Sequence, residues 1–407
     1  MNLIINSETA PLKSVIVHTP GHEVSLVNPE LKDELLFDDI IFEEDARREH
    51  LEMLTMFKAA MPKNGKIFEI TDLFIECFQQ KAAREFFVEK FIATHPRENL
   101  HTIEADLLAL EPAELVRFVI YGSTPSIGSF IMPPTPNILF TRDIAAVVGE
   151  SILLSRPARK ARLRESLLME ALIEFHPLFA TIKQNIIKIN GQESIEGGDV
   201  LVASEKVALI GMSERTSFSG LMAATEGLLK HGLERVLAVD IPKQRSSMHL
   251  DTIFTFASDD ECIVFPPAIT ERRNNVISLS SHNGFITAES MPSLKEALEE
   301  FLGHKMTFIN CGGDERTNQF REQWTDGANV FALAPGIIAG YGRNTNTFRE
   351  LQDHGYRLMN QFEFVEEFEN KSLDSAEKIA ISFWGHELCR GRGGARCMTM
   401  PIARATN

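Results

Sequence analysis

Short apolar runs rich in β-branched residues recur along the chain, and segments with apolar residues at helical spacing lie between them. The runs predict strands at Ser14–His18, Lys66–Ile70, Ile144–Val148, Ile152–Leu154, Asn185–Ile189, Val200–Ala203, Val207–Ile210, Val236–Val239, Ile253–Phe256, Cys262–Phe265, Met306–Ile309, Val330–Leu333 and Ile337–Ala339. The helical patterns cover Arg159–Phe175, Ser217–His231, Ser293–Leu302 and Thr347–His354. Gly149–Glu150 and Pro335–Gly336 each join two runs and predict hairpins. Because hairpins join many neighbours, the pattern predicts an α/β or α+β architecture and disfavours a Rossmann sheet.

The segment from Thr71 to about Ile120 has no strand pattern. Thr71–Asp72 is typical of a helix start, and Pro112 suits the first turn of another helix. Apolar residues follow Asp72 at helical spacing, at Leu73, Phe74, Cys77, Phe78, Phe86, Phe87 and Phe91. We therefore expect a helical insertion, residues 71–125, in a domain formed by residues 1–70 and 126–407.

Composition and charge limit the classes of partner. The 407 residues are 44% hydrophobic and 24% charged, which is ordinary for a globular enzyme, and the net charge of −16 argues against nucleic acid and anionic membranes as partners. No apolar run approaches the ~20 residues of a membrane span, and the first residues do not resemble a signal peptide. Five scattered cysteines predict neither a disulfide framework nor a zinc site. A cytoplasmic protein with a free reactive thiol fits these features.

The stretch GRGGARCMTM, Gly391 to Met400, places a cysteine at the end of a glycine-rich loop. Arg392 and Arg396 lie close to Cys397 in the sequence, and positive charge favours the nucleophilic thiolate. The Gly-x-Gly spacing lacks the strand-turn-helix context of a dinucleotide site. The loop therefore predicts a reactive cysteine with a flexible backbone around it.

Three further segments carry groups with which Cys397 could act. PNILFTRD ends in Asp143, IEGGDV places Glu196 before two glycines, and MHLDT contains His249 and Asp251. If MHLDT is extended, His249 and Asp251 point to the same face and suit an acid/base pair. Each also has a structural interpretation: a cap or turn for Asp143, a turn for Glu196 and a buried structural histidine for His249. The short His-Glu spacings of zinc enzymes are missing, so no metal site is predicted.

Taken in order, these segments resemble the arginine deiminase family of the pentein superfamily. The likeness covers nearly the whole chain, through HTPGHEVSLVNPELKDELLFDD (18–39), DARREH (45–50), PNILFTRD (136–143), ARLRE (161–165), IEGGDV (195–200), SERT (213–216), MHLDT (248–252), LAPGIIAGYGRN (333–344) and GRGGARCMTMPIAR (391–404). The resemblance implies a propeller of five ββαβ units around a pseudo-fivefold axis, with the active site in the central channel. It also implies that the helical stretch is the insertion typical of bacterial members.

The resemblance also implies a reaction, the hydrolysis of free L-arginine to L-citrulline and ammonia. Asp143 and Asp251 match the aspartates that hold the guanidinium, which pairs well with carboxylates. Cys397 would attack the central carbon and form an amidino-thioether, while His249 would transfer protons with Glu196 hydrogen-bonded to it. No metal or organic cofactor is implied. An amidinotransferase, an arginine dihydrolase and a non-catalytic pentein are the rival interpretations.

Further residues match positions at the other end of the substrate. Arg162, Arg215 and Arg392 match arginines that bind the α-carboxylate, which favours arginine over agmatine, whereas surface or helix salt bridges are the structural alternative. Asn137 and Phe140 match positions that line the pocket. The resemblance also implies a homo-oligomer, a dimer or tetramer, that acts in arginine catabolism.

One position departs from many family members, which carry Gly-His immediately before the cysteine. This chain has Ala395 and Arg396 there, a version that also occurs in the family. Two roles are open for Arg396. Its charge could lower the pKa of Cys397, or its side chain could face solvent.

Overall fold

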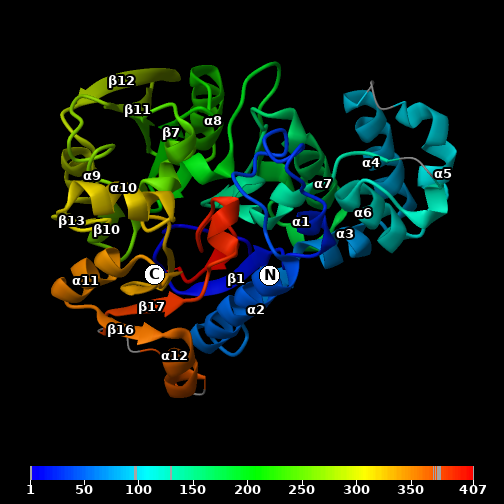
Figure 1. Ribbon diagram of the computed structural model, residues 1–407. Helices are drawn as coiled ribbons and strands as arrows, with labels where there is room; N and C mark the ends of the chain where they lie inside the picture. Colours follow the sequence, from blue (N-terminus) through cyan, green and yellow to red (C-terminus); the bar gives the residue numbers. More distant parts are fainter. Residues whose placement is uncertain are drawn as a thin grey trace.

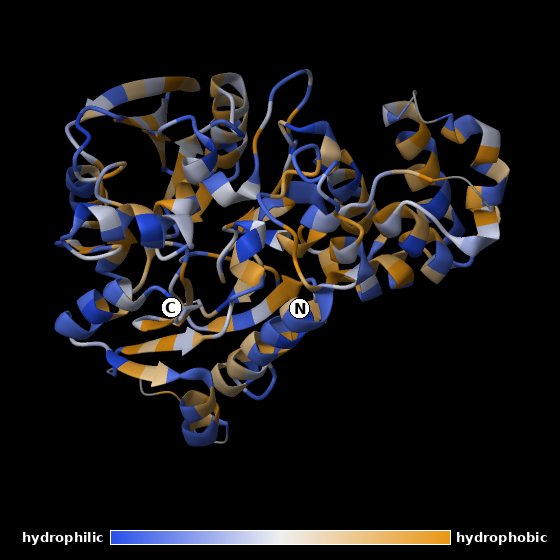
Figure 2. Ribbon diagram, viewed as in Figure 1, coloured by the Kyte–Doolittle hydropathy of each residue, from blue (hydrophilic) through white to orange (hydrophobic). Residues whose placement is uncertain are grey.

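The computed structural model describes residues 2–95, 99–128, 131–369, 371, 373 and 377–406. Figure 1 shows a body of small sheets with helices around them, and a group of helices that projects to one side. The N-terminal segment returns to the C-terminal strand, because Ile4 pairs with Ala403 in an isolated bridge. Figure 2 shows interior strands that are mostly hydrophobic and outer helices, such as α11 (Thr345–Asp353), that are mostly hydrophilic.

One strand pattern recurs in each of the five sheets that the described residues form. Two antiparallel strands are followed by a third strand that is parallel to the second. The successive triplets are β3 (Ala145–Val148), β4 (Ser151–Leu154) and β5 (Ile186–Lys188); β6 (Val200–Val202), β7 (Val207–Met212) and β8 (Arg235–Asp240); β9 (Phe254–Phe256), β10 (Glu261–Val264) and β13 (Thr307–Asn310); β14 (Phe331–Ala334), β15 (Ile337–Tyr341) and β17 (Ile379–Phe383); and β18 (Met400–Arg404), β1 (Leu12–Val17) and β2 (Lys66–Glu69).

A helix lies in the crossover between the two parallel strands of each triplet, because parallel strands cannot be joined by a tight turn. These helices are α2 (Glu43–Ala60), α7 (Leu163–Phe175), α8 (Phe218–Lys230), α9 (Leu294–Leu302) and α11. Two sheets have additions: the hairpin β11 (Val276–His282) and β12 (Phe285–Met291) extends one, and β16 (Arg357–Asn360) extends another. Shorter or additional helices are α1 (His22–Ser25), α10 (Arg316–Trp324) and α12 (Gln361–Phe368).

The projecting group, which we call the helical arm, lies between β2 and β3 and contains α3 (Ile70–Cys77), α4 (Lys81–Thr94), α5 (Glu104–Ala109) and α6 (Pro112–Tyr121). The predicted proline is at the first turn of α6, where its missing N–H costs nothing. Phe87 is wholly buried between Phe78 and Phe91, with ring centres 5.2 and 5.5 Å away. The exact division into residues 71–125 and the remainder of the chain stays a prediction.

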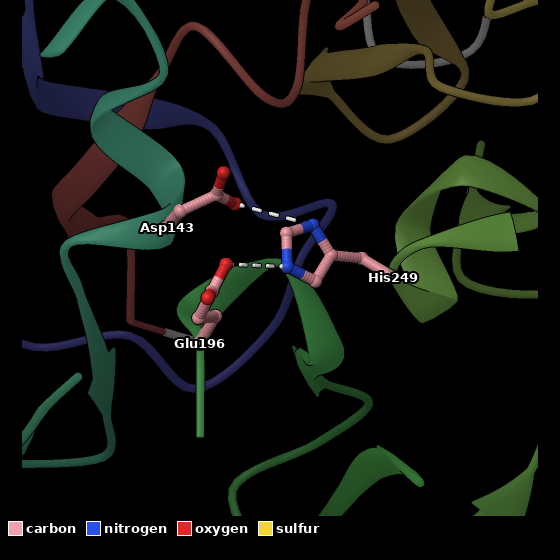
Figure 3. A group of neighbouring side chains, drawn as sticks. All are labelled: Asp143, Glu196 and His249. Carbon is pink, nitrogen blue, oxygen red and sulfur yellow. Dashed lines mark hydrogen bonds and ion pairs between the residues drawn. The ribbon is translucent and has the colours of Figure 1, made fainter. Parts of the chain in front are cut away.

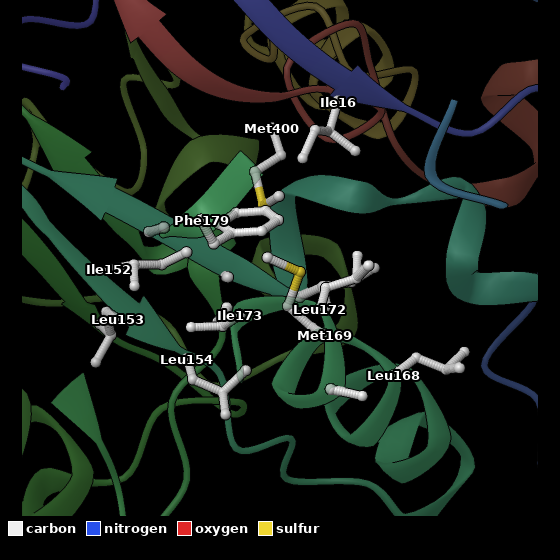
Figure 4. Packing of buried hydrophobic residues seen from close by; sticks show 14 of the residues in the cluster. Ile16, Ile152, Leu153, Leu154, Leu168, Met169, Leu172, Ile173, Phe179 and Met400 are labelled. Atoms are coloured by element: carbon white, nitrogen blue, oxygen red, sulfur yellow. The ribbon is translucent and has the colours of Figure 1, made fainter. Parts of the chain in front are cut away.

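The largest hydrophobic core joins elements that are remote in the sequence. Ile16 of β1 and Met400 of β18 lie close to Phe179 and to the β4 residue Ile152 (Figure 4). The same cluster continues through α7 into the arm, where it includes Phe87. The arm therefore shares its core with the body. Within the part of the chain that the structure describes, no helix has both the length and the apolarity needed to cross a bilayer.

All thirteen predicted strands and both predicted hairpins are confirmed, with ends shifted by a few residues. The prediction missed β11, β12, β16, β17 and β18. Most of β12 is exposed, so it lacks the apolar run of a buried strand. Pro401 lies within β18, which can include it because β18 is an edge strand. The helices α1, α2, α10 and α12 were also missed.

Candidate active site

The candidate residues lie in turns that lead into the first strand of a triplet. Asp143 ends the 3₁₀ turn Thr141–Asp143 just before β3, and Glu196 precedes the turn Gly197–Asp199 that leads into β6. His249 precedes the turn Leu250–Thr252 before β9, and Cys397 lies just before β18. The candidate residues thus occupy equivalent positions in different sheets, each just before the first strand of a triplet. His249 itself has an extended backbone, but Leu250–Thr252 form a 3₁₀ turn, so the condition of a fully extended MHLDT segment is not met.

His249 lies between two carboxylates (Figure 3). Its Nε2 is 2.9 Å from Glu196 Oε2, and its Nδ1 is 3.5 Å from Asp143 Oδ1. Burial by itself lowers the pKa of His249, but the charge of Asp143, the hydrogen bond to Glu196 and the charge of Asp199 outweigh it and raise the pKa to about 9. The imidazole is therefore a cation at neutral pH.

Gly198 has no side chain, and this leaves room for His249 and Asp143 to approach each other. A Cβ at this position would lie 2.6 Å from His249 Nδ1 and 2.7 Å from Asp143 Oδ1. A Cβ on Gly197 would lie 2.2 Å from the carbonyl oxygen of Arg142. The two glycines of IEGGDV are thus needed for close approach, one toward the backbone and one toward the candidate catalytic side chains.

Cys397 lies against Asp251. Its Sγ is 3.8 and 3.7 Å from the two carboxylate oxygens, and its backbone N–H donates to Asn329 Oδ1 at 3.0 Å. Burial raises the pKa of the thiol well above its ordinary value, and the charges of Asp251 and Asp143 raise it further, whereas Arg396 opposes the shift. The charge of Arg396 therefore favours the thiolate, as predicted from the sequence, but burial and the carboxylates outweigh it and the net shift favours the neutral thiol.

Two predicted arginines already contact acidic side chains of the site. Arg162 Nη1 is 2.5 Å from Asp143 Oδ2, and its Nη2 is 2.7 Å from Glu165. Arg215 Nη1 is 3.6 Å from Glu196 Oε2. Both arginines are buried, so the alternative of a surface salt bridge is wrong for them, but Arg162 does form a salt bridge at the start of a helix, with Glu165.

Arg392 differs from the other two arginines. Its guanidinium carbon is 3.7 Å from the ring centre of Trp324, and its Nη2 donates to the carbonyl oxygen of Ser246 at 3.3 Å. Arg392 is 3% exposed, yet its Nε and Nη1 have no hydrogen-bond partner among the described residues. A buried guanidinium with free donors is suited to bind an anion.

The two pocket residues have structural contacts. Asn137 Nδ2 donates to the carbonyl oxygen of Leu35 at 2.7 Å, and the backbone carbonyl oxygen of Asn137 accepts from Arg162. The ring of Phe140 lies 6.3 Å from that of Phe37, and a Cβ on Gly393 would lie 2.4 Å from the Phe140 ring. Phe140 thus packs against the glycine-rich loop of Cys397.

Sequence reasoning missed four buried residues of this region: Glu8, Asp199, Asp326 and Asn329. Asp199 accepts from Ser213, Thr216 and the backbone of Leu250, and so holds two turns and the loop after β7 together. Asn329 occupies the turn before β14, and this position relative to a predicted strand is a signal that could have identified it. Glu8 and Asp326 have no comparable local signal.

Several polar atoms of the site lack a hydrogen-bond partner within the described ranges, although two of them, His249 Nδ1 and Asp143 Oδ1, lie 3.5 Å apart as an ion pair. Some of these atoms are on acidic side chains and others on basic ones. They are Asp143 Oδ1, His249 Nδ1, Asp326 Oδ1 and Oδ2, and Arg392 Nε and Nη1. Buried polar groups are almost always hydrogen-bonded, so these atoms indicate a ligand with cationic and anionic ends. Asp143, Glu196 and His249 also offer donor atoms within 4.8 Å of one another, a spacing that a metal ion could use. The proton on His249 and the contact of Arg162 with Asp143 favour charge pairing instead.

Solved structures with similar folds define the class of protein. An amidinotransferase of saxitoxin biosynthesis from Microseira wollei matches with a TM-score of 0.59 and 13% identity, covering 100% of this chain and 98% of that one. The N-terminal domain of the cyanobacterial arginine dihydrolase ArgZ matches with a TM-score of 0.54 and 13% identity, covering 96% and 97%. The fold class is mixed α/β with several small sheets, and the chain shares it with these two enzymes.

Sequence comparison identifies the family within this class. A family model described as arginine deiminase matches residues 120–404. The arginine deiminase of Bacillus cereus (strain B4264) is 32% identical over 430 residues, covering 98% of both chains. That of Listeria monocytogenes serotype 4a (strain HCC23) is 32% identical over 427 residues, covering 99% of this chain and 98% of its own. The chain belongs to the arginine deiminase family.

Proposed function

We propose that the protein is an arginine deiminase that hydrolyses free L-arginine to L-citrulline and ammonia through an amidino-thioether on Cys397. The observation that carries this proposal is the arrangement of His249 between Glu196 and Asp143, with Asp251 against the Cys397 thiol. It combines a nucleophile, a proton donor and carboxylates that a planar cation can bind. Full-length similarity to arginine deiminases supports the same activity.

The substrate's guanidinium would bind between Asp143 and Asp251. Both carboxylates raise the pKa of the Cys397 thiol, so a bound cation would offset their effect and favour the thiolate. The thiol proton would leave to solvent, and the sulfur would face the central carbon of the guanidinium. Binding of the correct cation thereby activates the nucleophile.

The reaction then proceeds in two halves. The Cys397 thiolate forms a C–S bond to the guanidinium carbon, His249 donates its proton to the departing nitrogen, and the C–N bond breaks to release ammonia. Neutral His249 next takes a proton from water, and the resulting hydroxide attacks the same carbon. The C–S bond breaks and the thiolate is restored; the oxygen then gives its proton to this thiolate, which leaves neutral citrulline and the original thiol.

The amino-acid end of the substrate would lie toward Arg392, with Arg162 and Arg215 contributing positive charge. Asn137 and Phe140 would line the pocket between the two ends. A cavity of 570 Å³ borders this end of the site, since its lining includes Arg215 and also Phe37, which packs against Phe140. The free donors of Arg392 support its role as a carboxylate ligand.

The family resemblance supplies further parts of the proposal. We infer that the five strand triplets are ββαβ units of a propeller around a pseudo-fivefold axis and that residues 71–125 are its insertion. We also infer a homo-oligomeric, cytoplasmic enzyme that needs no metal or organic cofactor. The recurrence of one strand pattern in five sheets supports the proposed propeller.

Product analysis tests the proposed function. Purified protein is incubated with L-arginine, and citrulline, ornithine and ammonia are quantified by mass spectrometry and a colorimetric assay. The wild-type protein is expected to form citrulline and ammonia in equal amounts. Cys397→Ser should lose turnover by at least about 1000-fold, because a hydroxyl is scarcely ionised at neutral pH. Cys389→Ser, at a second buried cysteine nearby, should remain within about threefold of wild type.

Other products would contradict the proposal. Ornithine as the main product would indicate an amidinotransferase or a dihydrolase instead. Turnover by Cys397→Ser within tenfold of wild type would rule out the covalent step.

A further inference from the structure

Arg396 lies between two carboxylates from distant parts of the chain. Its Nη1 donates to Asp251 Oδ2 at 2.8 Å, and its Nε and Nη2 donate to the two oxygens of Glu8 at 3.1 and 3.0 Å. Nη2 also donates to the carbonyl oxygen of Val200 at 2.8 Å. The side chain is 1% exposed, so the alternative in which it faces solvent is wrong.

Glu8 is itself held by the body of the protein. Its backbone N–H donates to the carbonyl oxygen of Val202, and its Oε1 accepts from the backbone N–H of the same residue at 3.2 Å. The neighbouring Thr9 donates to Asp259. The N-terminal segment therefore provides a fixed carboxylate that binds one edge of the Arg396 guanidinium.

The contact with Arg396 leaves one oxygen of Asp251 available. Oδ2 accepts from Arg396 and also lies 3.7 Å from the Cys397 thiol, whereas Oδ1 contacts, among the described residues, this thiol alone, at 3.8 Å. A guanidinium is planar and can donate to two carboxylates at once, which an ammonium or an imidazole cannot do in the same geometry. The pair thus fixes the direction in which Asp251 presents its free oxygen.

We propose that Arg396 is a positioning residue, which holds Asp251 against Cys397 in the orientation that receives the substrate's guanidinium, and that Glu8 in turn holds Arg396. This inference rests on the proposed deiminase function. It gives a role to the arginine that replaces the more common histidine before the cysteine. It also connects the first residues of the chain to the reaction.

The charges around Asp251 agree with this role. Burial raises the pKa of Asp251, and Arg396 is the strongest of the groups that oppose this rise. The charged and titratable groups that act on or contact Asp251 are Arg142, Asp143, His249, Asp326, Arg396 and Cys397. Without Arg396 the carboxyl would take up a proton at a higher pH and lose its attraction for a cation.

Steady-state kinetics across pH 5–9 tests the proposal on the full-length protein. Arg396→Ala should lower kcat/KM by at least about 100-fold, because it leaves Asp251 and Glu8 buried without their partner. Its acidic limb of kcat/KM should also move to higher pH. Arg396→Lys keeps the charge and should recover at least about fivefold of this loss. Glu8→Gln should lower kcat/KM by about tenfold and move the acidic limb to lower pH, because Arg396 then acts on Asp251 alone.

Arg404→Lys is the matched control. Arg404 is equally buried and near Glu8, but it donates to the carbonyl oxygens of Ala10 and Ala332 and has no contact with Asp251. This variant should lose thermal stability yet stay within about threefold of the wild-type kcat/KM, with an unchanged pH profile. Circular dichroism melting is recorded for every variant.

Two results would overturn the inference while the wild-type protein forms citrulline. The first is a kcat/KM for Arg396→Ala within threefold of wild type. The second is a loss of kcat/KM that is the same at every pH and equally large in Arg396→Ala and Arg404→Lys. If Arg396→Ala does not fold, Arg396→Lys and Glu8→Gln test the inference instead. An acidic limb of kcat/KM that is unshifted in both variants would reject the positioning role of Arg396. A wild-type protein that forms no citrulline instead rejects the proposed function, and this inference with it.

Discussion

At the scale of single residues, burial and neighbouring charge set the protonation state of each group in the site. Burial raises the pKa of Glu196 by itself, but hydrogen bonding to His249 and the charge of Arg215 lower it to about 2. His249 has its pKa raised to about 9, and the Cys397 thiol has its pKa raised well above its ordinary value. At neutral pH the site therefore contains an acid and a thiol, and a cationic substrate completes the conditions for attack.

The basic limb of the pH profile should report on His249. Its pKa is raised on folding, so its proton and the stability that depends on it are present at low pH and lost as pH rises through about 9. We expect kcat to decline there, because the leaving nitrogen then lacks its acid. Glu196→Gln removes a charge that raises this pKa, so the decline should begin at lower pH. Ammonia release measured from pH 6 to 10 checks the shift.

Glu214→Gln provides the control for that profile. Glu214 contacts Arg215 at 3.0 Å, and its carboxylate is not among the groups that raise the pKa of His249. Its basic limb should match the wild type. An unchanged limb in Glu196→Gln would show that His249 does not supply the rate-limiting proton.

Substrate choice should depend on Arg392. Its unpaired donors favour arginine over agmatine, which has no carboxylate, by at least about 100-fold in kcat/KM. Arg392→Ala should raise the KM for arginine steeply and harm agmatine turnover much less. Arg390→Ala, at a nearby arginine that is partly exposed, should change neither substrate by more than about threefold. Equal wild-type efficiencies for arginine and agmatine would reject the carboxylate contact.

At the scale of elements, the turns before the first strands create the site. Each turn is short and wholly buried, and each ends where a strand begins, so its position is determined by the sheet that follows. Through its two carboxylate oxygens, Asp199 links two such turns, its own and Leu250–Thr252, and also the loop after β7 that contains Ser213 and Thr216. This connection keeps the candidate catalytic side chains in register with one another although they come from different sheets.

Gly198→Ala tests how closely these turns approach. The added Cβ would lie within 2.7 Å of both Asp143 Oδ1 and His249 Nδ1, so the two side chains would have to move apart. We expect kcat to fall by at least about 100-fold, since misplacement of about 1 Å has this effect on catalysis. Gly342→Ala, where a Cβ would lie 3.3 Å from its nearest neighbour, should keep near-normal activity. A Gly198→Ala enzyme with normal kcat would contradict the geometry described above.

At the scale of the whole molecule, shared cores connect the parts. One cluster runs from the helical arm through α7 to β1 and β18, and a second joins α2, β14, β15 and β17 to the segment that contains Cys397. Loss of packing in one part is therefore expected to loosen the others. The site depends on this continuity because it contains residues from position 8 to position 397.

Phe87→Ala tests whether the arm and body unfold together. Phe87 is wholly buried in the arm, and its truncation should lower the free energy of unfolding by about 3–5 kcal/mol. Because the core is shared, the temperature at which deiminase activity is lost should fall together with the circular dichroism midpoint. Phe42→Ala, at an exposed phenylalanine, should leave both unchanged. A separate early transition with unaltered heat inactivation would show that the arm is an independent domain.

Local sequence was sufficient for much of the fold. The strands of the triplets from β3 to β10 are short apolar runs, and their burial follows from the same residues that predicted them. Glycines and prolines marked the hairpins correctly because their backbone preferences act within a few residues. The missed strand β12 is largely exposed, and partners in the sheet stabilise it more than its own hydrophobicity.

For the chemistry of the site, too, some features follow from the sequence and others only from the tertiary structure. Sequence alone determined which groups were available, since Asp143, Glu196, His249, Asp251 and Cys397 stood out in short motifs. Only the tertiary structure decided that Glu8 meets Arg396, 388 positions away, and that Asn329 holds the backbone of Cys397. It also decided the high pKa of the thiol, because burial and electrostatic interactions depend on distances in space and have no counterpart in residue spacing.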